Sequence, residues 1–185
     1  YRTYPVSHYQ PNYDIESDHG TTHISVLDSN DMAVSLTSTI NLAFGSQLMD
    51  PETGVILNDQ MDDFSTTNKT NYFGLRPSPN NKIVPSKRPL SSTVPTIIEN
   101  RDGSVEMVVG GSGGSRILTA VAQTILNALE FDMRLDQAID SPRIHHQLLP
   151  NYAFVEDELS PHIREALKRL GHEASSRGRV SHQQL

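Results

Sequence analysis

Alternating apolar and polar positions predict a β-hairpin near the start of this chain. Residues 22–27 and 33–40 are both rich in β-branched and apolar side chains, and an Asp-Ser-Asn-Asp turn separates them. Because alternate side chains of a strand share a face, Thr39 and Asn41 are expected on one face. The hairpin would also bring both residues close to Thr21, which directly precedes the first strand.

A second hairpin and two helices are predicted further along the chain. Residues 96–99 and 105–109 are strand-like and flank an Asn-Arg-Asp-Gly turn. A short helix is expected from Arg134 to Asp140. Before it, a longer helix is predicted from apolar residues at the three- and four-residue spacing of a buried face: Ile117, Leu118, Val121, Ala122, Ile125, Leu126 and Leu129.

The last predicted helix has clear boundaries. Ser160 is a suitable N-cap, Pro161 fits the first turn, and Gly171 ends the helix. The residues expected on its buried face are Ile163, Ala166, Leu167 and Leu170.

Three stretches show no complete periodic element. Residues 1–20 carry four Tyr, two Pro and two His, and they are interpreted as an extended linker. Residues 65–89 are polar and Pro-rich and predict a long surface loop, either a lid over a site or a mobile solvated insertion. Residues 180–185 resemble the opening of a further strand.

The composition fits one globular domain, with 185 residues, 36% hydrophobic and 20% charged. The net charge of -7 argues against nucleic-acid binding, which needs clustered Lys and Arg. No apolar run approaches the roughly 20 residues of a membrane-spanning helix. Cys is absent, which excludes disulfide bonds and a cysteine nucleophile.

Two features bear on the origin of the chain. It does not begin with Met and shows no signal peptide, so we expect a fragment or a processed piece of a longer protein. Asn68-Lys69-Thr70 is an N-glycosylation sequon, which is consistent with the secretory pathway.

The leading candidate for chemistry is the Gly20-Thr21 pair at the entrance of the first strand. Self-cleavage of this peptide bond would free the α-amine of Thr21 beside its own hydroxyl. An α-amine has a reference pKa near ~7.7–8.0, so it can act as the base for that hydroxyl. The alternative is that Gly20 and Thr21 form only a turn.

Several sequence blocks extend this interpretation to most of the chain. Residues 21–28, Thr-Thr-His-Ile-Ser-Val-Leu-Asp, resemble the start of the small subunit of γ-glutamyltransferases, also called γ-glutamyltranspeptidases or glutathione hydrolases. Further blocks resemble the same family, in its order and at about its spacing: Thr37–Asn41, Asn58–Phe64, Lys87–Ser92, Gly110–Ser115 and Pro142–Gln147.

The resemblance implies an α+β fold of the N-terminal-nucleophile (Ntn) hydrolase type. Such a fold is a four-layer αββα sandwich, and this chain would form part of it. Residues 1–20 would be the C-terminal tail of the large subunit and the linker before the cleavage point. Residues 21–185 would be the small-subunit catalytic domain, truncated at its C-terminus.

The resemblance also assigns roles to individual residues. Thr21 would be the nucleophile freed by cleavage after Gly20, Thr39 would orient its hydroxyl, and the amides of Gly113 and Gly114 would form an oxyanion hole. Side chains that suit a γ-glutamyl head group accept from its ammonium or donate to its carboxylate. The family's substrate-binding residues match Asn41, Gln60, Asp63, Ser91 and Ser92.

Several of these motifs also fit other interpretations. Thr39 alone is an ordinary β-branched strand residue, and the Gly-rich segment could be a flexible turn. That segment lacks both the P-loop Lys and the G-x-G-x-x-G spacing. His145 and His146 are interpreted as structural, because adjacent residues of an extended segment face opposite ways and no third metal ligand is regularly spaced. Asp59 departs from the residue that the resemblance leads us to expect, and Arg88 does not match the family's substrate-binding Arg, which belongs to the large subunit.

The implied function is a self-processing γ-glutamyltransferase that cleaves glutathione and its conjugates through a γ-glutamyl-threonine acyl-enzyme. Water, an amino acid or a dipeptide would accept the glutamyl group. The expected partner is the large subunit of the same precursor, and no cofactor, metal or nucleic acid is expected. The protein is expected to enter the secretory pathway and to be extracellular, membrane-anchored or vacuolar. Two alternatives stay open: an amidase of the same fold acting on β-lactam side chains, and a non-catalytic homologue serving as a binding or structural subunit.

Overall fold

A computed structural model describes residue 8 and residues 20–66, 77–148 and 151–176. The predictions for the linker before Gly20, for the sequon at Asn68 and for a strand after residue 180 lie outside the described residues. Within the described residues, no helix combines the length and the apolar character that a membrane crossing requires.

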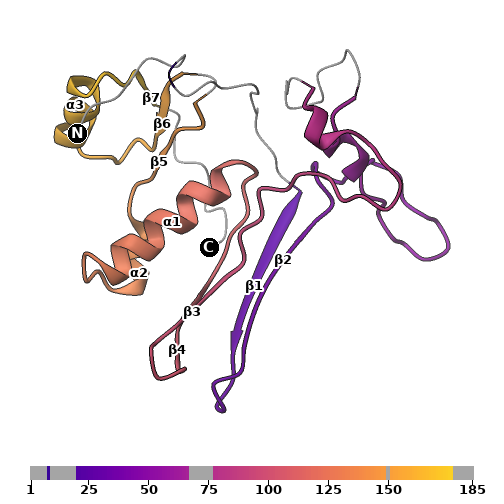
Figure 1. Ribbon diagram of the computed structural model, residues 1–185, viewed down its shortest axis with the longest axis horizontal. Coiled ribbons are helices and arrows are strands. Elements are labelled where there is room, and N and C mark those ends of the chain that lie inside the picture. The colour runs from indigo at the N-terminus through magenta and orange to yellow at the C-terminus, as the bar shows by residue number, and fades with distance from the viewer. Residues whose placement is uncertain (1–7, 9–19, 67–76, 149–150, 177–185) are drawn as a thin grey trace.

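Both predicted hairpins are confirmed (Figure 1). Strand β1 (Thr21–Leu27) pairs with β2 (Ala33–Thr39) in antiparallel register, and Thr21 lies directly opposite Thr39. Strand β3 (Thr96–Glu99) pairs with β4 (Val105–Val109) in the same sense. The first pairing places the N-terminal residue of β1 beside the C-terminal residue of β2.

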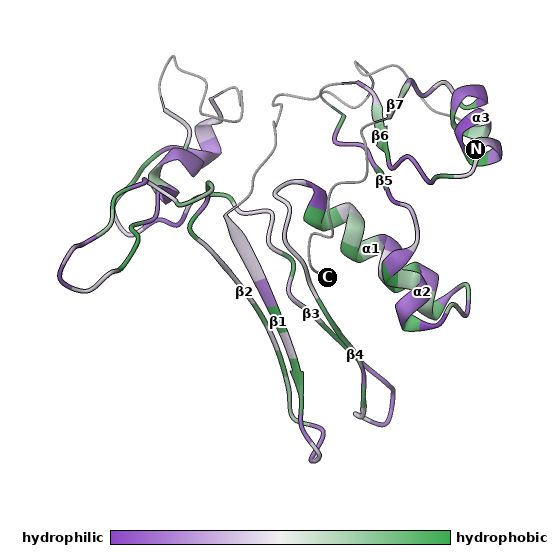
Figure 2. Cartoon of the chain, turned by 180° about the vertical axis from the view of Figure 1, so that it is seen from behind, coloured by the Kyte–Doolittle hydropathy of each residue, from purple (hydrophilic) through white to green (hydrophobic). Residues whose placement is uncertain are grey.

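The two faces of the first hairpin differ in their surroundings. Its more polar face is turned toward the second hairpin, and the Ser35 hydroxyl donates to the Val109 carbonyl oxygen at 3.1 Å. The opposite face is apolar and remains open, and Figure 2 shows hydrophobic positions gathering along both strands toward their turn. The apolar side chains of this open face, each 48–53% exposed, are Ile24, Val26, Val34 and Leu36.

Helix α1 (Arg116–Leu129) confirms the long predicted helix but not the full width of its buried face. Ile117 and Val121 pack with Val109 of β4 in one hydrophobic cluster. The prediction was wrong for three residues that are 37–52% exposed, Leu118, Leu126 and Leu129. Successive helical residues are about 100° apart, so the single stripe that faces the hairpin cannot include all the apolar positions.

A second cluster forms around a small sheet that the sequence did not predict. Strand β6 (Ala153–Val155) pairs antiparallel with β5 (Ile144–His145) and parallel with β7 (Ala174–Ser176). Ala153, Val155 and Leu159 are its buried residues. Strands of two or three residues are too short to show an alternating pattern, so periodicity could not reveal them.

The remaining helices have the predicted positions. Helix α2 (Leu135–Asp140) follows α1, and α3 (Pro161–Arg169) begins after Ser160, whose hydroxyl accepts the His162 N–H at 3.3 Å. The predicted buried face of α3 was wrong in part, because Ile163 and Leu170 are both 42% exposed. Only one edge of this helix meets the small sheet, where Leu167 packs against the second cluster.

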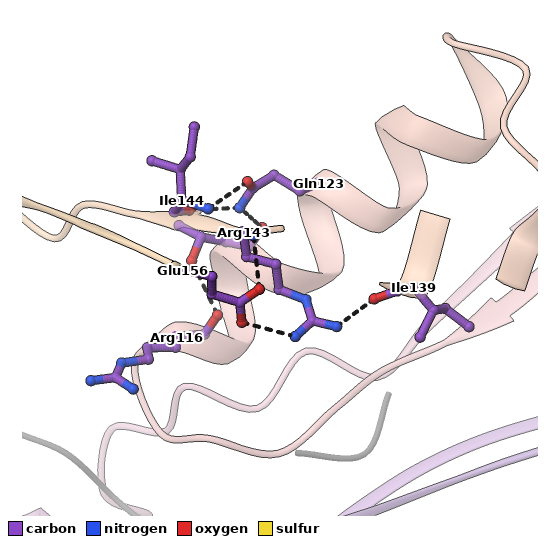
Figure 3. Close-up of polar contacts among 7 residues, drawn as sticks. Arg116, Gln123, Ile139, Arg143, Ile144 and Glu156 are labelled. Carbon is purple, nitrogen blue, oxygen red and sulfur yellow. Dashed lines mark hydrogen bonds and ion pairs between the residues drawn. The ribbon is translucent and has the colours of Figure 1, made fainter. Parts of the chain in front are cut away.

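A polar network joins α1 and α2 to the small sheet (Figure 3). The Gln123 amide of α1 donates to the Ile144 carbonyl oxygen at 2.6 Å and accepts the Ile144 N–H at 2.9 Å. Arg143 donates to the Ile139 carbonyl oxygen at the end of α2 and contacts the Glu156 carboxylate at 3.4 Å. These contacts fix the position of α1, at whose N-terminus the Gly-rich turn lies.

Candidate active site

Thr21 and Thr39 meet through their hydroxyl groups at the end of the first hairpin. The Thr21 hydroxyl donates to Thr39 Oγ1 at 2.9 Å. The Thr39 hydroxyl in turn donates to the Gly20 carbonyl oxygen at 3.2 Å and accepts the Asn41 N–H at 2.9 Å. A hydroxyl has one donor and two acceptor positions, so Thr39 uses its whole capacity at this point. The predicted neighbourhood of Thr21 and Thr39 is confirmed.

Gly20, the residue before Thr21, extends the pairing of the hairpin by one residue. The Gly20 N–H donates to the Asn41 carbonyl oxygen, and the Ile40 N–H donates to the Gly20 carbonyl oxygen, both at 2.9 Å. A Cβ atom at Gly20 would lie 2.3 Å from the carbonyl oxygens of Asn41 and Leu42. The absence of a side chain at Gly20 is therefore required by close backbone packing. The Gly20 carbonyl oxygen accepts two hydrogen bonds that both polarise it.

Asn41 does not continue the alternation of β2, contrary to the prediction. It follows the end of the strand with a φ of 72°, a left-handed conformation that Asn tolerates, and it is 2% exposed. Its side-chain amide donates to the Asp59 carbonyl oxygen at 3.4 Å. The Asp59 carboxylate accepts the Leu42 N–H at 3.1 Å. Asp59, the unexpected residue of its motif, thus holds the end of β2 against the segment that carries Gln60.

Gln60 and Asp63 form a second group of candidate residues on the short 3-10 helix η2 (Gln60–Asp63). The Gln60 side-chain amide donates to the Asp63 carboxylate. Its other terminal atom, Oε1, is buried, and within the described residues it has no hydrogen-bond partner. A buried carbonyl oxygen without a donor is costly. This atom and the Asp63 carboxylate together suit a bound cation that brings N–H groups.

Ser91 and Ser92 lie in the extended segment before β3. The Ser91 hydroxyl is within 3.0 Å of Thr93 Oγ1 and accepts the Thr93 N–H at 3.2 Å, and the residue is exposed. Ser92 is half-buried. The structure links this segment to Asp63 through a third residue, Asn81, whose side chain bonds to both sides.

The Gly-rich turn lies directly before α1 and has unusual backbone angles. Gly113 and Gly114 have φ values of 126° and 61°, a region that favours glycine. Their carbonyl oxygens accept the first N–H groups of the helix, from Arg116 at 3.3 Å and Ile117 at 3.1 Å. Both glycines are buried, and their own N–H groups make no hydrogen bond to another described residue. Such N–H groups at a helix N-terminus suit an anion.

A chain of hydrogen bonds from Ser115 through Gln147 to His145 holds this turn. The Ser115 hydroxyl donates to Gln147 Oε1 at 2.7 Å, and the same oxygen is 2.8 Å from Nε2 of His145. Because an amide oxygen only accepts, His145 carries its proton on Nε2, and its Nδ1 faces the Thr119 hydroxyl at 2.7 Å. Burial lowers the pKa of His145, although the contact with Gln147 opposes this effect. His145 therefore connects α1, β5 and the turn.

His23 lies on the same face of β1 as Thr21 and contacts the start of the Gly-rich segment. Its ring bonds to Thr37 Oγ1 at 2.8 Å and to Ser25 Oγ at 3.0 Å, and burial lowers its pKa. A Cβ atom at Gly110 would lie 2.1 Å from Cε1 of this ring. The nucleophile's strand and the Gly-rich segment thus meet at His23 and Gly110.

Replacing Gly110 by Ala is expected to destabilise the protein by about 1–3 kcal/mol, because the added methyl group overpacks the site and His23 must leave its hydrogen bonds. Thermal unfolding of the full-length protein measures this effect. In a His23→Ala background the same substitution should cost much less, since the ring is gone. An equal cost in both backgrounds would contradict the contact.

Comparison with known proteins decides the family. The family model described as γ-glutamyltranspeptidase matches residues 1–185. The chain belongs to the γ-glutamyltranspeptidase family. It is 53% identical over 171 residues to the glutathione hydrolase proenzyme 1 of Schizosaccharomyces pombe, an alignment that covers 92% of this chain and 27% of that relative. The chain therefore spans about a quarter of the length of this curated relative.

Solved structures confirm the fold. A T380A mutant of the Helicobacter pylori γ-glutamyltranspeptidase is 39% identical, with a TM-score of 0.79 and 84% of each chain covered. An acivicin-inhibited γ-glutamyltranspeptidase, described as showing critical roles of its C-terminus in autoprocessing and catalysis, gives the same values. The predicted α+β Ntn-hydrolase fold is therefore confirmed, and this chain forms part of its four-layer αββα sandwich.

The sequence had not indicated several residues that support this site. Gln147 and Asn81 had no role assigned, and His145 was interpreted only as structural. The contact of His23 with Gly110 was also missed, although His23 alternates with Thr21 and so had to share its face. No pattern in a single sequence could have revealed the role of Asn81, because its side chain bonds to backbone atoms 18 and 9 residues away.

Proposed function

We propose that the protein is a self-processing γ-glutamyltransferase that acts on glutathione and other γ-glutamyl compounds. The observation that carries the proposal is the hydrogen-bonded arrangement of Thr21, Thr39 and the Gly20 carbonyl group. It combines a nucleophile, a residue that orients it and a polarised carbonyl group at one peptide bond.

In the proposed self-cleavage, Thr21 Oγ1 adds to the carbonyl carbon of Gly20. The negative charge that develops on the Gly20 oxygen is stabilised by the Ile40 N–H and the Thr39 hydroxyl, which already donate to that atom. The C–N bond then breaks, the nitrogen takes the proton that the Thr21 hydroxyl has lost, and an ester joins Gly20 to Thr21. Water hydrolyses the ester, which frees the Gly20 carboxylate and leaves Thr21 with its hydroxyl and a new α-amine.

In the proposed transfer reaction, Thr21 Oγ1 attacks the γ-carbonyl carbon of the substrate. The new α-amine of Thr21 takes the proton that the hydroxyl loses. The Gly113 and Gly114 N–H groups would donate to the oxyanion, and their lack of other partners among the described residues supports this role. The leaving amine takes a proton as the γ-glutamyl ester forms. Water or the amine of an amino acid or dipeptide then displaces Thr21.

The head group of a γ-glutamyl substrate carries an ammonium and a carboxylate on one carbon atom. The Asp63 carboxylate and the unpartnered Oε1 of Gln60 would accept from the ammonium, with the Asn41 side chain beside them. The hydroxyls of Ser91 and Ser92 would donate to the carboxylate. The unpartnered Oε1 of Gln60 is the feature that favours an amine-bearing substrate.

The proposed partner is the large subunit of the same precursor. The chain covers 27% of the S. pombe relative, so most of such a precursor would lie outside it. The open apolar face of the first hairpin supports a partner that covers it, because four half-exposed aliphatic side chains stand together there. The sequon at Asn68 supports a location in the secretory pathway, with an extracellular, membrane-anchored or vacuolar protein.

Substrate assays on the full-length protein test the proposal. Release of p-nitroaniline from γ-glutamyl-p-nitroanilide is expected, together with release of glutamate from glutathione. Hydrolysis of an acyl-cephalosporin with no action on the anilide would instead indicate an amidase of β-lactam side chains. A folded protein that is inactive on both compounds and remains uncut would indicate a binding or structural subunit.

A further inference from the structure

Asn81 is a buried polar residue between the two segments that carry candidate substrate-binding groups. It ends the short 3-10 helix η3 (Pro79–Asn81) and is 9% exposed. Its side-chain Nδ2 donates to the Asp63 carbonyl oxygen at 2.7 Å, and its Oδ1 accepts the Leu90 N–H at 2.9 Å. Leu90 directly precedes Ser91. One amide therefore connects the Asp63 segment with the Ser91–Ser92 segment.

Backbone contacts fix Asn81 itself. Its carbonyl oxygen accepts the Ser65 N–H at 2.8 Å, which attaches it a second time to the Asp63 segment. The Lys87 ammonium donates to the carbonyl oxygens of Asn80 at 2.6 Å and Lys82 at 3.2 Å. These bonds fold the chain after Asn81 back toward it. The side-chain amide of Asn81 thus has a defined position relative to both segments.

We propose that Asn81 is a positioning residue that sets the separation between the ammonium-binding and the carboxylate-binding groups of the site. The inference rests on the proposed function, in which Asp63 receives the ammonium and Ser91 and Ser92 the carboxylate of one γ-glutamyl head group. Both charged groups stand on a single carbon atom, so their binding groups must keep a fixed distance. Binding groups of this kind must be held within about 0.5 Å of their productive positions.

The test compares a head group that carries both the α-ammonium and the α-carboxylate with ligands that lack one of these two groups. Glutarate lacks the ammonium, and 4-aminobutyrate lacks the α-carboxylate. The full-length protein is assayed with γ-glutamyl-p-nitroanilide, and inhibition constants are measured for L-glutamate, glutarate and 4-aminobutyrate. In Asn81→Ala, KM for the anilide and the inhibition constant of L-glutamate are expected to rise about 10-fold, the effect of one or two lost hydrogen bonds. Glutarate and 4-aminobutyrate should change by less than about 2-fold, because a single charged group can follow its own segment.

Two further variants sharpen the comparison. Asn81→Asp keeps the acceptor for Leu90 but places a carboxylate oxygen against the Asp63 carbonyl oxygen, so it should show the same pattern as Asn81→Ala. Asn80→Ala is the matched control, because Asn80 is exposed and contributes backbone atoms to the contacts described. It should leave all four constants unchanged.

Equal weakening of all three inhibitors in the Asn81 variants would overturn the proposal, and so would unchanged constants. Self-cleavage after Gly20, which Asn81 does not contact, and the thermal midpoint verify that the variants fold. If Asn81→Ala and Asn81→Asp fail to fold, Asn81→Ser keeps one hydroxyl toward one partner and carries the same test. A wild-type protein that releases no p-nitroaniline would refute the proposed function itself, a result distinct from an active protein that is indifferent to Asn81.

Discussion

Replacing Thr21 by Ala is expected to abolish both self-cleavage and γ-glutamyl transfer. The substitution removes the hydroxyl that donates to Thr39 from the opposite strand position and that would attack the Gly20 carbonyl carbon. In serine proteases, loss of the covalent nucleophile lowers kcat by about 10⁶-fold, so a loss of at least about 10³-fold is expected here. Cleavage is followed by denaturing gel electrophoresis, and transfer by release of p-nitroaniline from γ-glutamyl-p-nitroanilide.

Thr22→Ala is the matched control for this variant. Thr22 has the same chemistry one position later, but it is exposed and faces away from Thr39 because side chains alternate along β1. We expect this control to cut itself and to keep its activity. Thr21→Ser retains a hydroxyl and should retain measurable cleavage. A Thr21→Ala protein that still transfers γ-glutamyl groups would contradict the assignment of the nucleophile.

Replacing Thr39 by Val is expected to slow self-cleavage by about 100-fold, the typical effect of removing one donor to a developing oxyanion. Val has nearly the shape of Thr, so the packing of β2 is kept while the hydroxyl is lost. That hydroxyl donates to the Gly20 carbonyl oxygen and accepts from Thr21 and from Asn41. The time course of cleavage of the purified precursor measures the effect.

Two neighbouring substitutions separate the chemical role of Thr39 from a structural one. Thr39→Ser restores the hydroxyl and should restore most of the rate. Ser38→Ala changes the preceding residue, which is exposed on the opposite face of β2, and should leave the rate unchanged. If the Thr39→Val protein cut itself as fast as the wild type, Thr39 would be an ordinary strand residue with no role in the cleavage reaction.

The local elements of this fold could be predicted because their signals are local. Alternation and turn residues revealed both hairpins, and their pairing then placed Thr21 opposite Thr39. Capping residues gave the start and end of α3 in the same way. In each case the residues that determine the element lie within it.

Tertiary packing set the limits of prediction from the sequence. Leu118 and Leu126 of α1 are exposed although they are apolar, because only one stripe of the helix meets the hairpin. The requirement for Gly20 comes from the carbonyl oxygens of Asn41 and Leu42, which approach it closely. The bridge made by Asn81 joins backbone atoms of residues 63 and 90. Such contacts depend on how distant segments meet, which one sequence does not state.

The structure places the predicted site residues in several separate groups. Gly20 and Thr39 lie beside Thr21 as expected, whereas Asn41 lies past the end of β2, where its N–H donates to Thr39 and its side chain bonds to Asp59. Two other pairs, Gln60 with Asp63 and Gly113 with Gly114, each lie on a short defined element. The sequence did not indicate the contacts that connect these groups. Asp59 and Asn81 join the end of β2 and the Ser91–Ser92 segment to the segment of Gln60 and Asp63 through hydrogen bonds. His23 of β1 packs against Gly110 of the Gly-rich segment.

The central claim is that the chain cuts itself before Thr21 and exposes this residue as the nucleophile. Intact mass measurement with N-terminal sequencing of the folded full-length protein tests it most directly. The account predicts two fragments, one of which begins with Thr21. A folded protein that remains uncut, or one cut at another bond, would contradict it.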